Sequence, residues 1–239
     1  MRLIVREVAK RFGPTVALAG VSLRADAGEI HAVLGENGAG KSTLMAVLTG
    51  GLLPDSGAME LDGEGYAPTT PFEAQRRGVA IVHQEPALCP DLTVAENIAL
   101  GREPARFGVI DRRRSRATAA KTLALLSPTP PDPDALVGRL LPGDRQLCAI
   151  GRARAPADCG LLILDEPTSS LPAAEVERLH RAVRQIAEQG ITVLYISHFL
   201  EEVKALCHRF TVLRDGKTVG DGDVPDTASI VVDYNEGMQ

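Results

Sequence analysis

The sequence lacks any hydrophobic run long enough to cross a membrane. No segment approaches the ~18 uncharged apolar residues that a spanning helix needs, although 44% of the 239 residues are hydrophobic. The N-terminal stretch MRLIVREVAKRFG also lacks an apolar core of signal-peptide length. These absences predict a cytoplasmic protein.

Paired cysteines and excess positive charge are absent too. Cys89, Cys148, Cys159 and Cys207 are widely spaced and form no C-x-x-C pair of the kind used in zinc or redox sites, so we interpret them as buried free thiols. The net charge of -5 argues against a nucleic-acid partner for the domain as a whole. The length suits one large globular domain, or a domain with a subdomain.

What the sequence does contain is a series of short strand patterns. Apolar segments within 1–34, 57–63 and 78–84 are bounded by turn residues and are typical of strands. The apolar run LLIL at 161–164, which leads into Asp165, is typical of a parallel strand that is buried on both faces.

Helical patterns alternate with these strands. The segment 171–190 has helical spacing, with Pro172 near its start and Gly190 past its end. The alternation predicts an α/β fold with a mostly parallel sheet and antiparallel β elements near the N-terminus. A helix-favouring block predicts a small helical subdomain at 95–154, within a core made by the remaining residues, 1–94 and 155–239.

The segment GENGAGKST is the strongest local signal. It satisfies G-x-x-x-x-G-K-[ST] between a predicted strand and a predicted helix. Its glycines let the backbone curl so that N–H groups face a polyphosphate, Lys41 reaches the phosphates and the Ser42 hydroxyl binds Mg²⁺. An ordinary glycine-rich turn is the alternative, which the flanking strand and helix disfavour. We predict a P-loop NTPase core whose nucleotide contacts include Gly35, Asn37, Gly38, Ala39, Gly40, Lys41, Ser42 and Thr43.

Two carboxylates end the apolar strand LLILDEP. Ligands bind at the carboxyl ends of strands in open α/β sheets. Asp165 would hold Mg²⁺, directly or through water, and Glu166 would orient or deprotonate an attacking water. Without the glycine-rich loop, a solvated acidic turn would be the better interpretation.

Four further elements narrow the class: VHQEP around Gln84, the PGD turn at Gly143, SSLP after the carboxylates, and YISH ending at His198. With the two motifs above, they resemble the nucleotide-binding domain of ABC transporters, in which phosphate loop, Q-loop, signature, Walker B strand, D-loop and H-loop follow in this order. The stretches GENGAGKST, HQEPAL, TVAENIALGRE and YISHFLEEV are also similar to the N-terminal ATPase half of monosaccharide importers of the ribose, galactose and xylose type.

The resemblance implies further site residues. Gln84 would touch Mg²⁺ and the attacking water, and His198 would contact the γ-phosphate. Phe12 matches the aromatic on which adenine stacks, with Val16 beside it. Taken alone, Gln84 would be a surface residue, His198 a partly buried histidine and Phe12 a core residue.

The signature departs from the family pattern. Leu141 stands where the family has a serine that binds the γ-phosphate held by a partner domain, whereas Gly143 and the following helix N-terminus remain. Pro172 likewise replaces the aspartate that many members carry in the D-loop. Since two such domains close head to tail in the family, the change at Leu141 is expected to weaken the site on the partner domain.

The resemblance therefore implies an ATP- and Mg²⁺-dependent ATPase half of a sugar importer at the inner face of the membrane. Its partners would be a second ABC ATPase domain, hetero or fused rather than identical, an integral permease and, indirectly, a solute-binding protein. Low turnover is expected of the isolated chain. The alternatives are a nucleotide-binding regulator with little turnover, or a DNA-repair or translation ATPase. The repair class needs coiled-coil arms that are longer than this insertion, and the translation class carries two ATPase domains.

Overall fold

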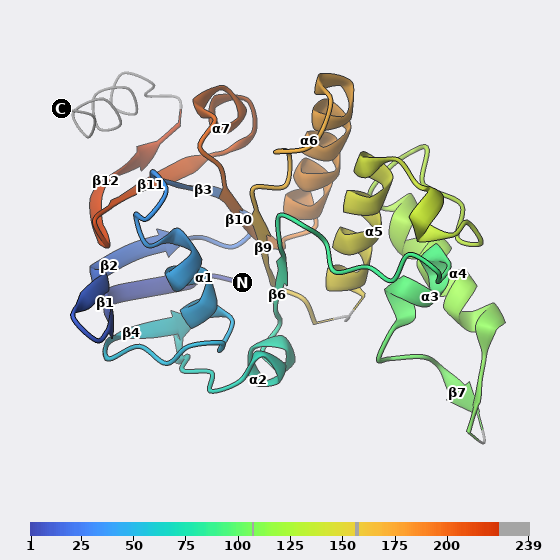
Figure 1. Cartoon of the computed structure of the whole chain (residues 1–239), viewed down its shortest axis with the longest axis horizontal. Coiled ribbons are helices and arrows are strands. Elements are labelled where there is room, and N and C mark those ends of the chain that lie inside the picture. Colours follow the sequence, from blue (N-terminus) through green and yellow to red (C-terminus); the bar gives the residue numbers. More distant parts are fainter. Residues whose placement is uncertain (107, 156–157, 225–239) are drawn as a thin grey trace.

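A six-stranded sheet runs through the centre of the computed structural model (Figure 1), which describes residues 1–106, 108–155 and 158–224. Its strand order is β12-β11-β3-β10-β9-β6, and its pairs are parallel except for the antiparallel β11–β12 hairpin. The strands are β3 (Ile30–Leu34), β6 (Val79–Val82), β9 (Leu161–Asp165), β10 (Thr192–Ile196), β11 (Arg209–Arg214) and β12 (Lys217–Asp223). The mostly parallel sheet confirms the α/β prediction.

A second, antiparallel sheet flanks the central one near the N-terminus, as predicted. Its order is β2-β1-β4-β5, and its strands are β1 (Leu3–Phe12), β2 (Thr15–Ala25), β4 (Ser56–Leu61) and β5 (Glu64–Gly65). Phe12 pairs with Thr15 across a two-residue turn in which Gly13 has a φ of 56°. The turn places Phe12 at the exposed tip of the β1–β2 hairpin.

Seven helices surround the sheets within the described residues: α1 (Lys41–Leu48), α2 (Pro71–Arg76), α3 (Val94–Ala99), α4 (Arg112–Ala124), α5 (Pro142–Arg154), α6 (Ala173–Glu188) and α7 (Leu200–Leu206). Figure 1 shows α3 and α4 gathered at the end of the molecule opposite the antiparallel sheet, with α5 and α6 between them and the central strands. A short hairpin, β7 (Ala105–Arg106) with β8 (Val109–Ile110), and a 3-10 turn at Val137–Arg139 complete the described elements.

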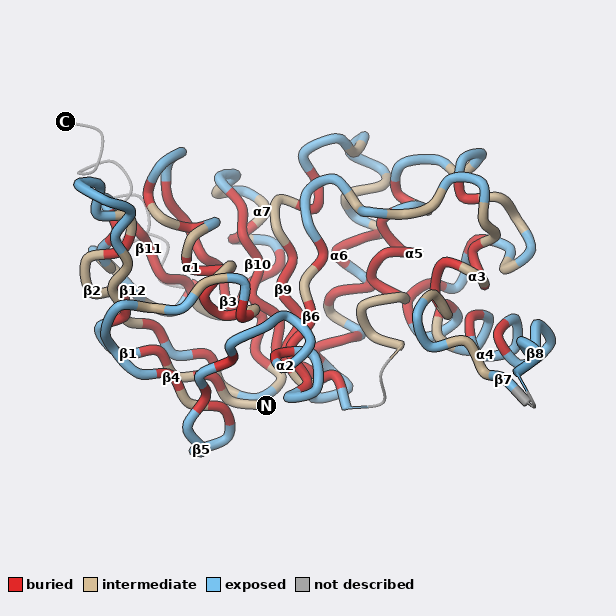
Figure 2. The backbone as a smooth tube through the Cα atoms, turned by 60° about the horizontal axis from the view of Figure 1, so that its bottom comes forward, coloured by how far each residue is buried: buried red, intermediate tan, exposed pale blue. Residues whose placement is uncertain are grey.

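Side chains on the two faces of the central sheet belong to two separate hydrophobic clusters. Along β9, Leu162 and Leu164 pack into the cluster under α5 and α6, whereas Leu161 and Ile163 pack into the cluster shared with α1 and the antiparallel sheet. This alternation follows from the two-residue period of a strand. Figure 2 shows the buried residues concentrated along the central strands and the inner sides of α5 and α6.

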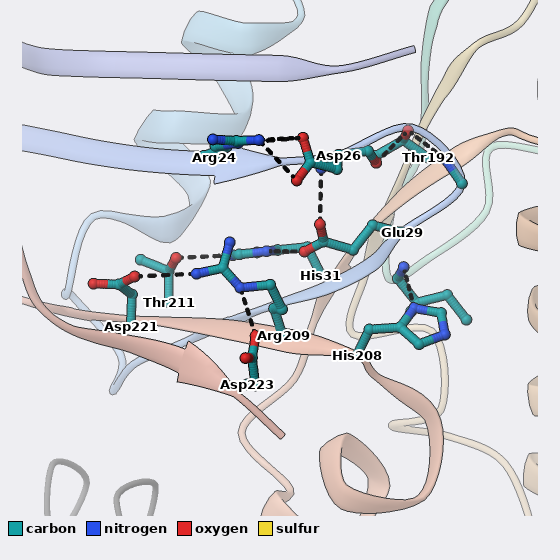
Figure 3. A network of polar contacts seen from close by, with 12 residues as sticks. Arg24, Asp26, Glu29, His31, Thr192, His208, Arg209, Thr211, Asp221 and Asp223 are labelled. Atoms are coloured by element: carbon teal, nitrogen blue, oxygen red, sulfur yellow. Dashed lines mark hydrogen bonds and ion pairs between the residues drawn. The ribbon is translucent and has the colours of Figure 1, made fainter. Parts of the chain in front are cut away.

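A polar network ties β3 to the β11–β12 hairpin (Figure 3). His31 is buried, with Nδ1 2.7 Å from Glu29 Oε1 and Nε2 2.8 Å from Thr211 Oγ1. Burial raises the pKa of Glu29, but hydrogen bonds from His31 and the Asp26 N–H outweigh burial and hold it below its ordinary value. The network satisfies polar groups that the hydrophobic core would otherwise leave unpaired.

The structure also describes the cysteines and the length of the helices. The four cysteines form no disulfide, and Cys148, Cys159 and Cys207 are buried. Within the described residues, no helix has the length and apolar character needed to cross a membrane.

Candidate nucleotide-binding site

The loop between β3 and α1 has the geometry of a phosphate cradle. Gly35 and Gly40 have φ values of 155° and 102°, and a Cβ would lie 2.5 Å from Leu213 O at residue 35 and 2.7 Å from Ala17 O at residue 40. Only glycine fits these two positions. Gly40 is the N-cap of α1 and offers no capping side chain, so the first N–H groups of the helix remain available to an anion.

Lys41 begins α1, and its side chain folds back over this loop. Its Nζ donates to Gly35 O at 2.6 Å and to Glu36 O at 3.0 Å, and the residue is 7% exposed. Burial lowers the pKa of Lys41, against an opposing effect of the carboxylates of Glu166 and Asp165. The ammonium group is thus held between the loop and the carboxylates, where a bound polyphosphate could take over its hydrogen bonds.

Asp165 and Glu166 follow at the end of β9. Burial, together with the adjacent Glu166, raises the pKa of Asp165. Glu166 has a φ of 43°, rare for a residue with a side chain, and its N–H donates to Ile196 O of β10 at 3.1 Å. Its Oε1 lies 3.3 Å from His198 Nδ1. The strained backbone aims the Glu166 carboxylate at His198.

Gln84, after β6, completes the group at the carboxyl ends of the parallel strands. Its Nε2 donates to Ser169 Oγ at 3.2 Å, which links it to the segment after Glu166. A cleft of about 470 Å³ collects most of the predicted residues. It is lined by Thr15, Val16, Ala17, Glu36, Asn37, Gly38, Gly40, Lys41, Ser42, Thr43, Gln84, Asp165 and Glu166.

Five predicted residues lie outside this lining. Two of them, Gly35 and Ala39, line a second cavity of about 260 Å³ that shares residues 36–38 with the cleft. Phe12 is 47% exposed at the hairpin tip, with Lys10 Nζ 6.0 Å from its ring centroid, so the alternative of a core residue is wrong. His198 is about two-fifths exposed and reaches the cleft through Glu166. Gly143 is buried in the first turn of α5 and contributes nothing to the cleft of its own chain.

Sequence reasoning missed Glu202, which holds the ends of two strands together. Its Oε2 accepts hydrogen bonds from Thr168 Oγ1 at 2.8 Å, Tyr195 OH at 2.9 Å and Ser197 Oγ at 3.2 Å. Thr168 follows Glu166 by two residues, and Ser197 precedes His198 directly. Glu202 lies on α7, so no local pattern could have linked it to the site.

The oxygen groups of the cleft suit a magnesium ion. Ser42, Gln84 and Asp165 offer hydroxyl, amide and carboxylate oxygens, which are the ligands that Mg²⁺ prefers. Burial and the adjacent Glu166 carboxylate raise the pKa of Asp165, and a bound cation would favour its charged form. No group of three or more His, Cys, Asp or Glu side chains is placed to hold a metal within the described residues. A magnesium ion here would need further ligands, such as phosphate oxygens and water.

The fold is shared with solved ATP-binding cassettes. A nucleotide-free ATP-binding cassette from an ABC transporter superposes with a TM-score of 0.85 at 25% identity, covering 100% of this chain and 98% of the other. The ADP conformation of another ABC transporter cassette gives a TM-score of 0.82 at 26% identity, covering 98% and 99%. These likenesses define an ATP-binding cassette.

The family follows from the sequence comparisons. The model of the ABC transporter family matches residues 18–169, and the chain belongs to this family. The ribose import ATP-binding protein RbsA of Rhodococcus jostii is 44% identical over 232 residues, covering 97% of this chain and 45% of that protein. RbsA 1 of Rubrobacter xylanophilus is 46% identical over 218 residues, covering 91% and 43%. The chain therefore spans about half the length of the curated relatives it matches.

Proposed function

We propose that this chain is the ATP-hydrolysing half of an importer for a simple sugar, acting at the cytoplasmic face of the membrane. The observation that carries the proposal is the cleft in which Lys41, Gln84, Asp165 and Glu166 meet. The substrate class rests on the two relatives, both named for ribose import. The cleft keeps its lysine and both carboxylates, which favours a working ATPase over a regulator with little turnover.

The phosphate cradle binds the triphosphate of ATP in this proposal. The N-terminus of α1 and Lys41 contact the β- and γ-phosphates, and Ser42, Gln84 and Asp165 hold Mg²⁺. When bound, Mg²⁺ neutralises charge on the phosphates. Phe12 stacks on adenine from the hairpin tip, for which its exposed ring is suited.

Glu166 orients the attacking water and accepts its proton. His198, 3.3 Å from Glu166, contacts the γ-phosphate and fixes the carboxylate. Glu202 supports both residues through Thr168 and Ser197.

A second ATPase domain supplies the missing signature. Leu141 and Gly143 do not line the cleft of their own chain, and in this proposal the signature of the second domain closes over the nucleotide. A hetero or fused partner is favoured because a homodimer would carry Leu141 in both sites. We assign the signature to a helical subdomain at 95–154, within a core of 1–94 and 155–239, of which 107, 156–157 and 225–239 lie outside the described residues.

A groove beside the cleft suits the permease. Its volume is about 630 Å³, and its lining includes Phe72, 69% exposed, and Leu88. The segment 83–88 borders both spaces, because Gln84 lines the cleft while His83 and residues 86–88 line the groove. Contact with a membrane partner in the groove would thus shift the segment 83–88 and with it the position of Gln84 in the cleft.

The test is transport by the assembled importer. The chain, with its second ATPase domain and permease, would be reconstituted in vesicles with the solute-binding protein, and ATP-driven uptake of labelled ribose, galactose and xylose measured. Uptake of one of these sugars that Glu166→Gln abolishes is expected. ATP hydrolysis without uptake of any sugar would refute the proposal of a sugar importer, but the proposal that the chain hydrolyses ATP would stand.

A further inference from the structure

The first turn of α5 packs against α6 through two neighbouring pairs. Gly143 lies so close to Glu175 that a Cβ at residue 143 would be 1.8 Å from Glu175 Oε2. Beside it, Asp144 Oδ1 is 2.8 Å from Arg178 Nη1. Glu175 and Arg178 are three residues apart and share one face of α6. The contact joins the signature helix to the helix that follows the catalytic carboxylates.

Negative charge gathers at this helix end. Leu141, the N-cap of α5, gives no side-chain hydrogen bond. The Oε2 atom of Glu175 is buried without a hydrogen-bond partner among the described residues. The Oδ1 atom of Asp144 is also buried and makes no well-directed hydrogen bond, so the ion pair with Arg178 is the contact that offsets its charge.

Arg178 reaches a third element as well. Its Nε donates to Ser127 Oγ at 3.3 Å, and its Nη2 donates to Thr129 O, both in the segment after α4. The planar guanidinium presents its donors in a fixed fork, which a lysine cannot reproduce. One half-buried side chain on α6 therefore fixes α5 relative to both α6 and the end of α4.

We propose that Arg178 is a positioning residue for ATP hydrolysis at the partner domain's site. Acting through Asp144, it holds Gly143 and the N-terminus of α5 in the orientation that meets the partner's γ-phosphate. It also cancels a carboxylate charge that would repel that phosphate. The inference rests on the proposed pairing of two ATPase domains. Arg178 does not line the cleft of its own chain.

A mixing experiment separates this role from a general effect on folding. A small amount of ATP-binding chain is mixed with an excess of signature donor. The donor carries Lys41→Ala, so that it cannot turn over ATP itself, and Leu141→Ser, so that its signature supports closure between two copies of this chain. Turnover above that of the ATP-binding chain alone reports closure against the donor's signature. Arg178→Ala is then placed in either chain, and Arg181→Ala, an exposed position on the same helix, serves as the matched control in the donor.

We expect Arg178→Ala to reduce the donor-dependent turnover at least tenfold more when the donor carries it than when the ATP-binding chain carries it. A factor of this size corresponds to the loss of one charge-assisted hydrogen bond. Arg181→Ala should have no such effect. Adding Asp144→Asn to the Arg178→Ala donor removes the uncompensated charge and should recover part of the turnover.

Three results would overturn the inference. Equal losses from Arg178→Ala in either chain would mean a general structural effect, and undiminished turnover with the altered donor would mean that the signature does not need Arg178. Absence of recovery with Asp144→Asn would refute the electrostatic part. If the donor with Leu141→Ser and an intact Arg178 fails to stimulate turnover at all, the proposed head-to-tail pairing is wrong, and the role of Arg178 falls with it.

Discussion

The exposed leucine at the start of α5 allows a sharp test of the signature. Leu141 is the N-cap of this helix, 62% exposed and without a capping hydrogen bond, and Pro142 occupies the first helical position. Proline suits that position, so Pro142 does not distort the start of the helix. The hydroxyl of a serine at residue 141 could accept a hydrogen bond from a backbone N–H in the first turn of α5, or donate a hydrogen bond to a phosphate oxygen.

These two effects have different sizes and different readouts. The cap should stabilise the chain without nucleotide by ~1 kcal/mol. A hydrogen bond to a charged phosphate oxygen is worth ~1.5–3 kcal/mol, or roughly ten- to hundredfold in ATP-driven closure. Urea unfolding of Leu141→Ser without ATP measures the change in the free energy of unfolding that the cap gives. Sedimentation with ATP in a Glu166→Gln background measures the dimerisation that accompanies closure.

Leu141→Ala is the control, because it removes the apolar side chain without adding a hydroxyl. We expect Leu141→Ser, but not Leu141→Ala, to shift the ATP-bound chain from monomer towards dimer. A tight ATP-bound homodimer of the unmodified chain would refute the claim that Leu141 weakens closure. Equal dimerisation of the serine and alanine variants would refute the role of the hydroxyl.

Four further predictions follow from the cleft and the polar network. Lys41→Ala should abolish tight MgATP binding in calorimetry, since it removes the buried cation from the phosphate loop; unchanged affinity would contradict its role. Glu166→Gln should keep ATP binding but cut turnover by ~10² in the paired assembly, and undiminished hydrolysis would mean that another residue activates the water. Glu202→Gln should lower turnover with little change in nucleotide affinity, because it loosens the segments after Glu166 and before His198; a matching loss of affinity would point to a wider disturbance. Glu29 has a lowered pKa in the folded state, so it adds stability above its ordinary pKa of 4.5 that is lost as pH falls through the lower folded value. Thermal unfolding of Glu29→Gln should therefore show a flatter acid dependence than the unmodified chain, and parallel curves would exclude this contribution.

The fold class and the phosphate loop could be predicted because their signals are local. Strand and helix periods are written in consecutive residues, and the motif from Gly35 to Thr43 needs a turn of fixed length between β3 and α1. The β7–β8 hairpin was not predicted, because strands of two residues are too short to show a period. The family resemblance placed His198 at the site, but the sequence did not predict its contact with Glu166, which joins the ends of β9 and β10.

Contacts between helices were beyond the reach of sequence, and they change how the altered signature is understood. Leu141 alone predicts a loop that has lost a phosphate ligand, whereas the structure adds the ion pair of Asp144 with Arg178 beside it. At the other end of α5, Arg152 Nη1 donates to Ala87 O at 2.8 Å, in the segment that borders both cleft and groove. A helix of 13 residues spans about 20 Å. In the proposed assembly, α5 therefore meets the partner domain at one end and the permease-facing segment at the other, so a shift imposed at either end moves both.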